Sequence, residues 1–153
     1  MQSAHPKNPL LRIFWYNETM EKEIMYTAKF VRDPELLLRK FPPKHVRIFA
    51  HHSTIAFKPK NVDGIEIGRK SLMKIIGRAY DEKGDALLVE NPISENEYPH
   101  ITLSCADNVP PFYSNELLKK ASENNTIEHF DAPEEIEVIE GYFDGKNEVI
   151  EKK

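Results

Sequence analysis

The sequence of 153 residues predicts a single α+β domain with mostly antiparallel strands, and three observations support this fold class. Apolar, β-rich segments alternate with two short helical patterns. Glycine-containing turns separate two pairs of neighbouring strands, which is typical of hairpins. The length is that of one domain, because domains commonly hold about 100 to 150 residues.

The first predicted elements are a strand, a helix and a long strand. Residues 24–31 are apolar and rich in β-forming types. Asp33 followed by Pro34 is typical of an N-cap with proline at the first helical position, so a helix is expected through Lys40. Residues 46–57 are β-branched and aromatic and lie between prolines, which predicts one strand over their whole length.

The later elements are a hairpin, a strand, a helix and a second hairpin. They are expected over residues 71–80 with 86–90, 100–105, 114–121, and 135–142 with 147–150. The order divides into two halves, each with a histidine-bearing strand, a helix and a hairpin. We therefore expect a bilobal fold with two mostly antiparallel sheets, related by pseudo-two-fold symmetry around a central cleft, with helices outside. Within the single domain 1–153, residues 24–150 form the expected core and residues 1–23 an appended N-terminal arm.

Composition excludes several classes of protein. Cys105 is the single cysteine, so no internal disulfide forms, and Cys and His show no zinc-type spacing. No apolar run reaches the roughly 18 residues of a membrane span, and the N-terminus does not resemble a signal peptide. We therefore expect a cytoplasmic protein, and a monomer is the favoured oligomeric state. We expect no membrane partner, no metal and no cofactor.

Charge is distributed unevenly along the chain. The formal net charge is −4, but residues 39–78 hold ten Lys and Arg against two Asp and Glu, and acids dominate from residue 131 onward. A basic segment in an acidic protein fits a bounded anionic ligand better than a long nucleic acid duplex. A solvated surface rich in lysine explains the same run and stays the alternative.

One pattern occurs twice: H-S-T-I at residues 52–55 and H-I-T-L at residues 100–103. Each copy falls in a predicted strand, where side chains two residues apart emerge on one face about 6.6 Å apart. Each copy therefore presents an imidazole and a hydroxyl to one cleft. Phosphodiester cleavage requires a base for the nucleophile, an acid for the leaving oxygen and neutral donors for the remaining oxygens. Histidine serves both proton-transfer roles near neutral pH.

These motifs resemble those of the two-histidine (HxT) phosphoesterase superfamily, also called LigT-like. H-S-T-I-A-F is similar to the first family motif and P-H-I-T-L-S to the second. Members include RNA 2′,3′-cyclic phosphodiesterases, bacterial 2′,5′ RNA ligase proteins and the cyclic phosphodiesterase domain of fungal and plant tRNA ligases. The resemblance implies a metal-independent hydrolase in RNA repair that opens RNA 2′,3′-cyclic phosphate ends to 2′-phosphates. It also implies that His52 and His100 are the acid–base pair and that Thr54 and Thr102 bind the phosphate, and it leaves open which histidine is the base.

Two other functions fit the same residues. One is hydrolysis of 2′,5′-linked or cyclic oligonucleotide signals, and the other is non-catalytic binding of phosphorylated RNA ends. In all three, the partner is an RNA end or a small cyclic or oligonucleotide substrate. Lys58 and Lys60 follow the first motif and are candidates for contacts to flanking phosphates. Tyr98 and Tyr113 flank the second motif and are candidates for base stacking, with loop packing as the alternative.

The first motif is preceded by a second histidine, His51. On a strand, His51 lies on the face opposite His52, so we expect a buried or surface histidine without a part in the chemistry. A metal site formed by His51, His52 and His100 is not expected, because no Cys, Asp or Glu accompanies them at short spacing.

Overall fold

The computed structural model of the chain describes residues 23–152, and within that range it contains eight strands and two helices. In chain order these are β1 (Tyr26–Val31), α2 (Pro34–Lys40), β2 (Arg47–Ile48), β3 (His52–Phe57), β4 (Lys70–Tyr80), β5 (Gly84–Val89), β6 (His100–Cys105), α3 (Tyr113–Glu123), β7 (Glu128–Phe143) and β8 (Glu148–Val149). The expected N-terminal arm lies outside the described residues, apart from Glu23.

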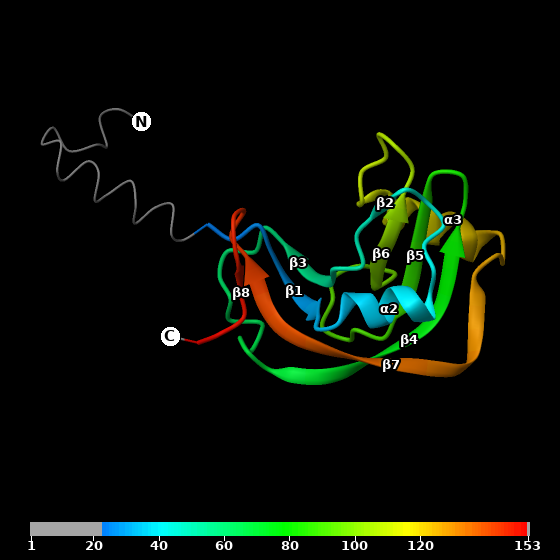
Figure 1. The fold of residues 1–153 in the computed structure, drawn as a ribbon. Coiled ribbons are helices and arrows are strands. Elements are labelled where there is room, and N and C mark those ends of the chain that lie inside the picture. The colour runs from blue at the N-terminus through cyan, green and yellow to red at the C-terminus, as the bar shows by residue number, and fades with distance from the viewer. Residues whose placement is uncertain (1–22, 153) are drawn as a thin grey trace, which may run out of the picture.

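The strands form one antiparallel sheet, curled into a half-barrel, with the order β2-β6-β5-β4-β7-β1-β3 and with β8 paired to β7 (Figure 1). The predicted strand-rich antiparallel architecture with two helices is confirmed. The expectation of two separate sheets is wrong, because the long strands β4 and β7 pair with each other and join the halves. β6 and β3, which carry the two motifs, each lie two strands away from this central pair.

A bulge bends the sheet near its centre. The pairing of β4 with both β5 and β7 shifts register between Ile75 and Gly77, and such a bulge bends its strand and increases the local twist. A Cβ atom at Gly77 would lie 2.9 Å from the carbonyl oxygen of Glu128, so the close approach of β7 requires glycine there. The bend turns the two ends of the sheet toward each other.

Most of the predicted elements are present at the expected places. The Asp33 carboxylate accepts a hydrogen bond from the backbone N–H of Leu36 at 3.1 Å, which confirms the capped helix α2. Both hairpins and α3 are also confirmed. β7 begins at Glu128, before the expected residue 135, because its first residues pair with the end of β4.

The long strand predicted over residues 46–57 is wrong in one respect, because it is broken into β2 and β3. Ala50 has a φ of 51°, a left-handed conformation that ends the extended run. The backbone N–H groups of Phe49 and Ala50 donate to the carbonyl oxygens of Leu103 and Thr102 on β6, at 2.9 and 3.0 Å. β2 pairs with β6, whereas β3 pairs with β1 at the other end of the sheet. We call residues 49–51 the crossing, since they lead the chain from one sheet end to the other.

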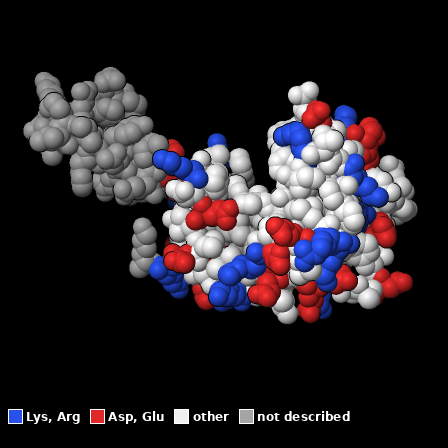
Figure 2. All heavy atoms as spheres, in the orientation of Figure 1, with Lys and Arg blue, Asp and Glu red and all other residues white. Residues whose placement is uncertain are grey.

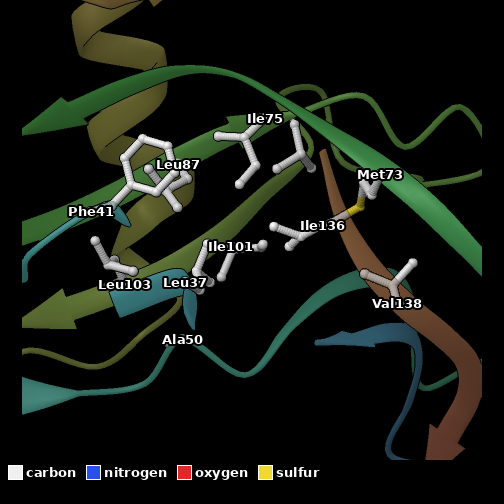
Figure 3. Close-up of a cluster of buried hydrophobic side chains, with 11 residues drawn as sticks. Leu37, Phe41, Ala50, Met73, Ile75, Leu87, Ile101, Leu103, Ile136 and Val138 are labelled. Carbon is white, nitrogen blue, oxygen red and sulfur yellow. The ribbon is translucent and has the colours of Figure 1, made fainter. Parts of the chain in front are cut away.

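Two clusters of apolar side chains cover opposite faces of the sheet. Leu87 and Val89 of β5 belong to the larger cluster, together with Leu37 of α2. Figure 3 shows the labelled side chains of this cluster, Leu37 and Leu87 among them, converging from α2 and the strands. Ala86 and Leu88 alternate with them on β5 and belong to the cluster under α3. Since successive strand residues point to opposite faces, α2 and α3 pack on the two sides of the sheet.

The basic segment and the acidic C-terminal segment lie side by side in the fold. β4 pairs with β7, which places Lys74 opposite Glu135, and the Lys40 ammonium lies 2.8 Å from the Glu134 carboxylate. Figure 2 shows Lys and Arg atoms interspersed with Asp and Glu atoms along the edge formed by these strands. The two oppositely charged segments therefore lie next to each other, and Lys40 and Glu134 form an ion pair between them.

A buried ion pair connects the sheet to the loop that leads into β2. Arg78 donates to both carboxylate oxygens of Asp85 at 3.0 Å, and the Asp85 side chain is fully buried. Asp85 also accepts from the Ser104 hydroxyl at 2.8 Å and from the Lys44 backbone N–H at 3.0 Å. Arg78 donates a further bond to the carbonyl oxygen of Pro42 at 2.8 Å. The network fixes the loop after α2, and hence the path of the chain into the crossing.

Replacing Asp85 tests this network. Asp85→Ala leaves the buried Arg78 guanidinium without its counter-ion, so we expect the free energy of unfolding to fall by about 3–5 kcal/mol. Urea denaturation of the two proteins measures the difference. Glu134→Ala is the matched control, because its pair with Lys40 is exposed and such pairs contribute about 0–1 kcal/mol. Equal, small losses in both variants would contradict a structural role for the buried pair.

Candidate active site

The crossing brings the two motif strands into contact. β3 starts directly after it and packs against β6, to which the crossing is hydrogen-bonded. His52 and His100 are each the first residue of their strand. They are close enough for a charge on His100 to lower the pKa of His52. Figure 2 shows the surface hollowed between the parts of the molecule that hold β3 and β6, with few charged atoms in the hollow.

His52 lies in a largely apolar, aromatic setting. Its ring stacks on Tyr26 with 4.5 Å between centroids, and the Phe30 ring lies at 6.0 Å. Its Nδ1 is 2.8 Å from Nδ1 of His51. Burial, followed by the charges of His51 and His100, lowers the pKa of His52 to about 3. The imidazole is therefore neutral near pH 7.

His100 is held by a backbone acceptor. It is 8% exposed, and its Nδ1 lies 2.7 Å from the carbonyl oxygen of Tyr98. A carbonyl oxygen only accepts, so Nδ1 carries the proton and Nε2 is left free for chemistry. Burial lowers the pKa of His100, while the bond to the Tyr98 carbonyl opposes that shift.

The two threonines differ in their surroundings. The Thr102 hydroxyl donates to the carbonyl oxygen of Pro111 at 3.1 Å and lies 2.8 Å from the Ser114 hydroxyl, which bridges β6 to the start of α3. The Thr54 side chain is half-buried, and its hydroxyl makes no hydrogen bond to the residues that the structure describes. Of the two hydroxyls, that of Thr54 is the one with its donor uncommitted.

The other predicted site residues fall into different environments. Lys58 and Lys60 are exposed beyond the end of β3, and Tyr98 is half-buried beside the second motif. Tyr113 is 7% exposed, its hydroxyl donates to Asp81 at 2.5 Å, and its ring packs on Gly84. The ring of Tyr113 therefore belongs to the core and has no free face on which a base can stack.

Sequence reasoning missed two contributors to the site. His51 bonds His52 on one side, and its Nε2 lies 2.5 Å from the Glu148 carboxylate on the other. The expected alternation along one strand misplaced His51, because it lies in the crossing rather than in β3. The His-His doublet was the available signal, whereas nothing in the sequence pointed to Glu148, 97 residues away.

Within residues 23–152, no three His, Cys, Asp or Glu side chains gather as a group able to hold a metal ion. In the same part of the chain, no helix is long and apolar enough to cross a bilayer.

Comparison with known families bears directly on this site. Residues 70–142, just under half of the chain, match the family model of the fungal tRNA ligase phosphodiesterase domain. The match runs from the start of β4 almost to the end of β7 and includes the second motif, while the first motif precedes it. No curated protein and no solved structure matches the chain. The family match confirms the resemblance predicted from the two motifs and supports a hydrolase of the RNA cyclic phosphodiesterase type.

The low pKa of His52 makes stability depend on pH. The unfolded chain binds a proton at the ordinary value of 6.5, whereas folded His52 binds one only near pH 3. Its contribution to the free energy of unfolding is thus complete above about pH 6.5 and is lost as pH falls toward about 3. His52→Gln cannot titrate, so we expect its stability to fall less than that of wild type between about pH 7 and about pH 4.5.

Urea denaturation at both pH values measures this effect. His129→Gln is the control, because His129 is exposed on β7 and its loss should leave the pH dependence of wild type intact. Parallel losses of stability in wild type and His52→Gln would show that His52 is not held neutral by burial.

Proposed function

We propose that the chain hydrolyses RNA 2′,3′-cyclic phosphate ends to 2′-phosphates by metal-independent acid–base catalysis with His52 and His100. The observation that carries this proposal is the contact of β3 with β6, each beginning with a motif histidine. The family match supports a cyclic phosphodiesterase in general. Beyond that general activity, we propose the substrate, the position of the phosphate in the product and the role of each residue.

We assign the base to His52. A histidine can accept a proton only when its imidazole is neutral, and burial keeps the His52 imidazole neutral near pH 7. It removes a proton from water as the water oxygen attacks phosphorus and the bond from phosphorus to the 3′ oxygen breaks. His100, protonated at Nε2, gives that proton to the departing 3′ oxygen. The negative phosphate favours the charged form of His100 once substrate is bound, and the Tyr98 carbonyl keeps the ring oriented.

Polar contacts to the substrate complete the proposed site. Thr54 donates to a non-bridging phosphate oxygen, where charge increases in the transition state. The Thr102 hydroxyl can donate to the phosphate only if its hydrogen bond to the Pro111 carbonyl breaks. Its main role in the proposed site is therefore to hold β6 against α3. Lys58 and Lys60 contact flanking phosphates, and Tyr98 contacts a base. Pseudo-two-fold symmetry of the two halves, a monomeric state and a cytoplasmic location remain part of the proposal.

Loss of either histidine tests the mechanism. We expect His52→Ala and His100→Ala each to lower kcat/KM by about 10²–10⁴-fold, the usual contribution of a general acid or base. The assay follows a short RNA with a 2′,3′-cyclic phosphate end, in EDTA, by mass spectrometry of the 2′-phosphate product. The exposed His129→Ala variant is the control and should keep wild-type turnover.

Four results would count against the proposal. Full turnover in His52→Ala or His100→Ala would exclude the two-histidine mechanism, and activity abolished by EDTA would exclude metal independence. Turnover of 2′,5′-linked or cyclic dinucleotides, with none of the cyclic phosphate end, would show that the substrate is an oligonucleotide signal. Saturable binding of RNA ends without any turnover would identify a binding module.

A further inference from the structure

A chain of hydrogen bonds leads from Glu148 through His51 to His52. Nε2 of His51 lies 2.5 Å from the Glu148 carboxylate, and Nδ1 of His51 lies 2.8 Å from Nδ1 of His52. The two imidazoles are perpendicular, and the Phe30 ring meets His51 edge-on at 5.5 Å. Glu148 is held in place by the pairing of β8 with β7, where it lies opposite Phe143. These two hydrogen bonds therefore connect the C-terminal hairpin to the first motif.

The direction of these bonds follows from what each group can donate. A carboxylate only accepts, so the bond to Glu148 places a proton on Nε2 of His51. In neutral His51, Nδ1 is then an acceptor, and the bond between the rings requires the proton to lie on Nδ1 of His52. Nε2 of His52 is left with its lone pair. His100 reaches the same tautomer more simply, through the Tyr98 carbonyl.

We propose that His51 and Glu148 are positioning residues that hold His52 in the Nδ1–H tautomer, so that its Nε2 faces the substrate as the base. This inference rests on the proposed function, because it assigns the orientation of the proposed base. Its geometry resembles the arrangement in which a carboxylate fixes a histidine, with a second imidazole inserted between them.

Stability does not account for the arrangement. The side chains of His51 and Glu148 are 42% and 39% exposed, and even a fully charged pair this exposed would contribute only about 0–1 kcal/mol. The His51 imidazole instead satisfies one ring nitrogen of the half-buried His52, whose tautomer would otherwise be free to change, and the Glu148 carboxylate holds the His51 ring.

Several titratable groups lie close to Glu148, His51 and His52. Within residues 23–152, the other titratable groups that act on His52 are Tyr26, on which it stacks, and His100. Burial, and then the Glu148 carboxylate, raise the pKa of Tyr26 to about 12, so it stays neutral. Glu148 itself lines a surface groove that also contains basic side chains. These are Arg32, Lys70 and Lys152.

Two variants and two measurements test the inference. His51→Phe keeps a ring against Phe30 but removes both nitrogens, and Glu148→Gln removes the charge that fixes His51. Nitrogen NMR of the resting protein reports which ring nitrogen of His52 carries the proton. We expect the Nδ1–H form in wild type and a mixture of both tautomers in the variants. We also expect kcat to fall about 10–100-fold with KM unchanged, as for other supporting contacts to a working histidine.

Controls separate positioning from folding. Glu151→Gln removes a neighbouring exposed carboxylate on the same terminal segment and should change neither the His52 tautomer nor kcat. Glu148→Asp keeps the charge and should restore part of the lost activity. Urea midpoints of His51→Phe and Glu148→Gln should match that of wild type, because the pair is exposed.

The two proposals fail in different ways. If His52→Ala is inactive while His51→Phe and Glu148→Gln keep both the wild-type tautomer and full turnover, positioning by this chain is wrong and the proposed function stands. If wild type cleaves no cyclic phosphate end, the proposed function is wrong. The NMR measurement then decides by itself whether His51 and Glu148 set the tautomer of His52.

Discussion

The backbone bonds of the crossing are the interaction on which the site depends. Phe49 and Ala50 donate to β6 immediately before the chain enters β3, so the two motif strands are joined without belonging to neighbouring positions of the sheet. The left-handed conformation of Ala50 allows this change of partner. Without it, residues 46–57 would continue as one strand along β6, and His52 would not reach its place on the Tyr26 ring.

Other features of the fold support the crossing from both sides. The buried Arg78–Asp85 pair fixes the loop before β2, and the bulge near Gly77 bends the sheet so that its ends approach each other. The two histidines that meet there are oriented by different partners. A backbone carbonyl holds His100, whereas a second histidine and a carboxylate hold His52. In both rings the bond at Nδ1 leaves Nε2 available for proton transfer.

Local patterns in the sequence predicted the elements well, because they depend on neighbouring residues. The Asp33 cap, both hairpins and the motif strands could be placed from turn and periodicity signals alone. Contacts between distant segments could not. No local signal marks the left-handed Ala50 within a β-branched run, and Tyr113, a candidate for base stacking, packs on Gly84 instead. The repeated motif identified both histidines, yet the Glu148 carboxylate could be found only once the fold placed β8 on β7, within reach of His51 in the crossing.

A crystal structure of the protein with a bound nucleoside 2′-phosphate, the product class of the proposed reaction, tests the central claim most directly. That claim is that the crossing unites the two motifs in one catalytic site. The phosphate is expected between the two motif strands, with Nε2 of His52 and Nε2 of His100 both within hydrogen-bond distance of its oxygens. The Thr54 hydroxyl is expected to donate a third hydrogen bond to the phosphate. A phosphate bound away from the crossing, or in contact with one histidine alone, would contradict the account.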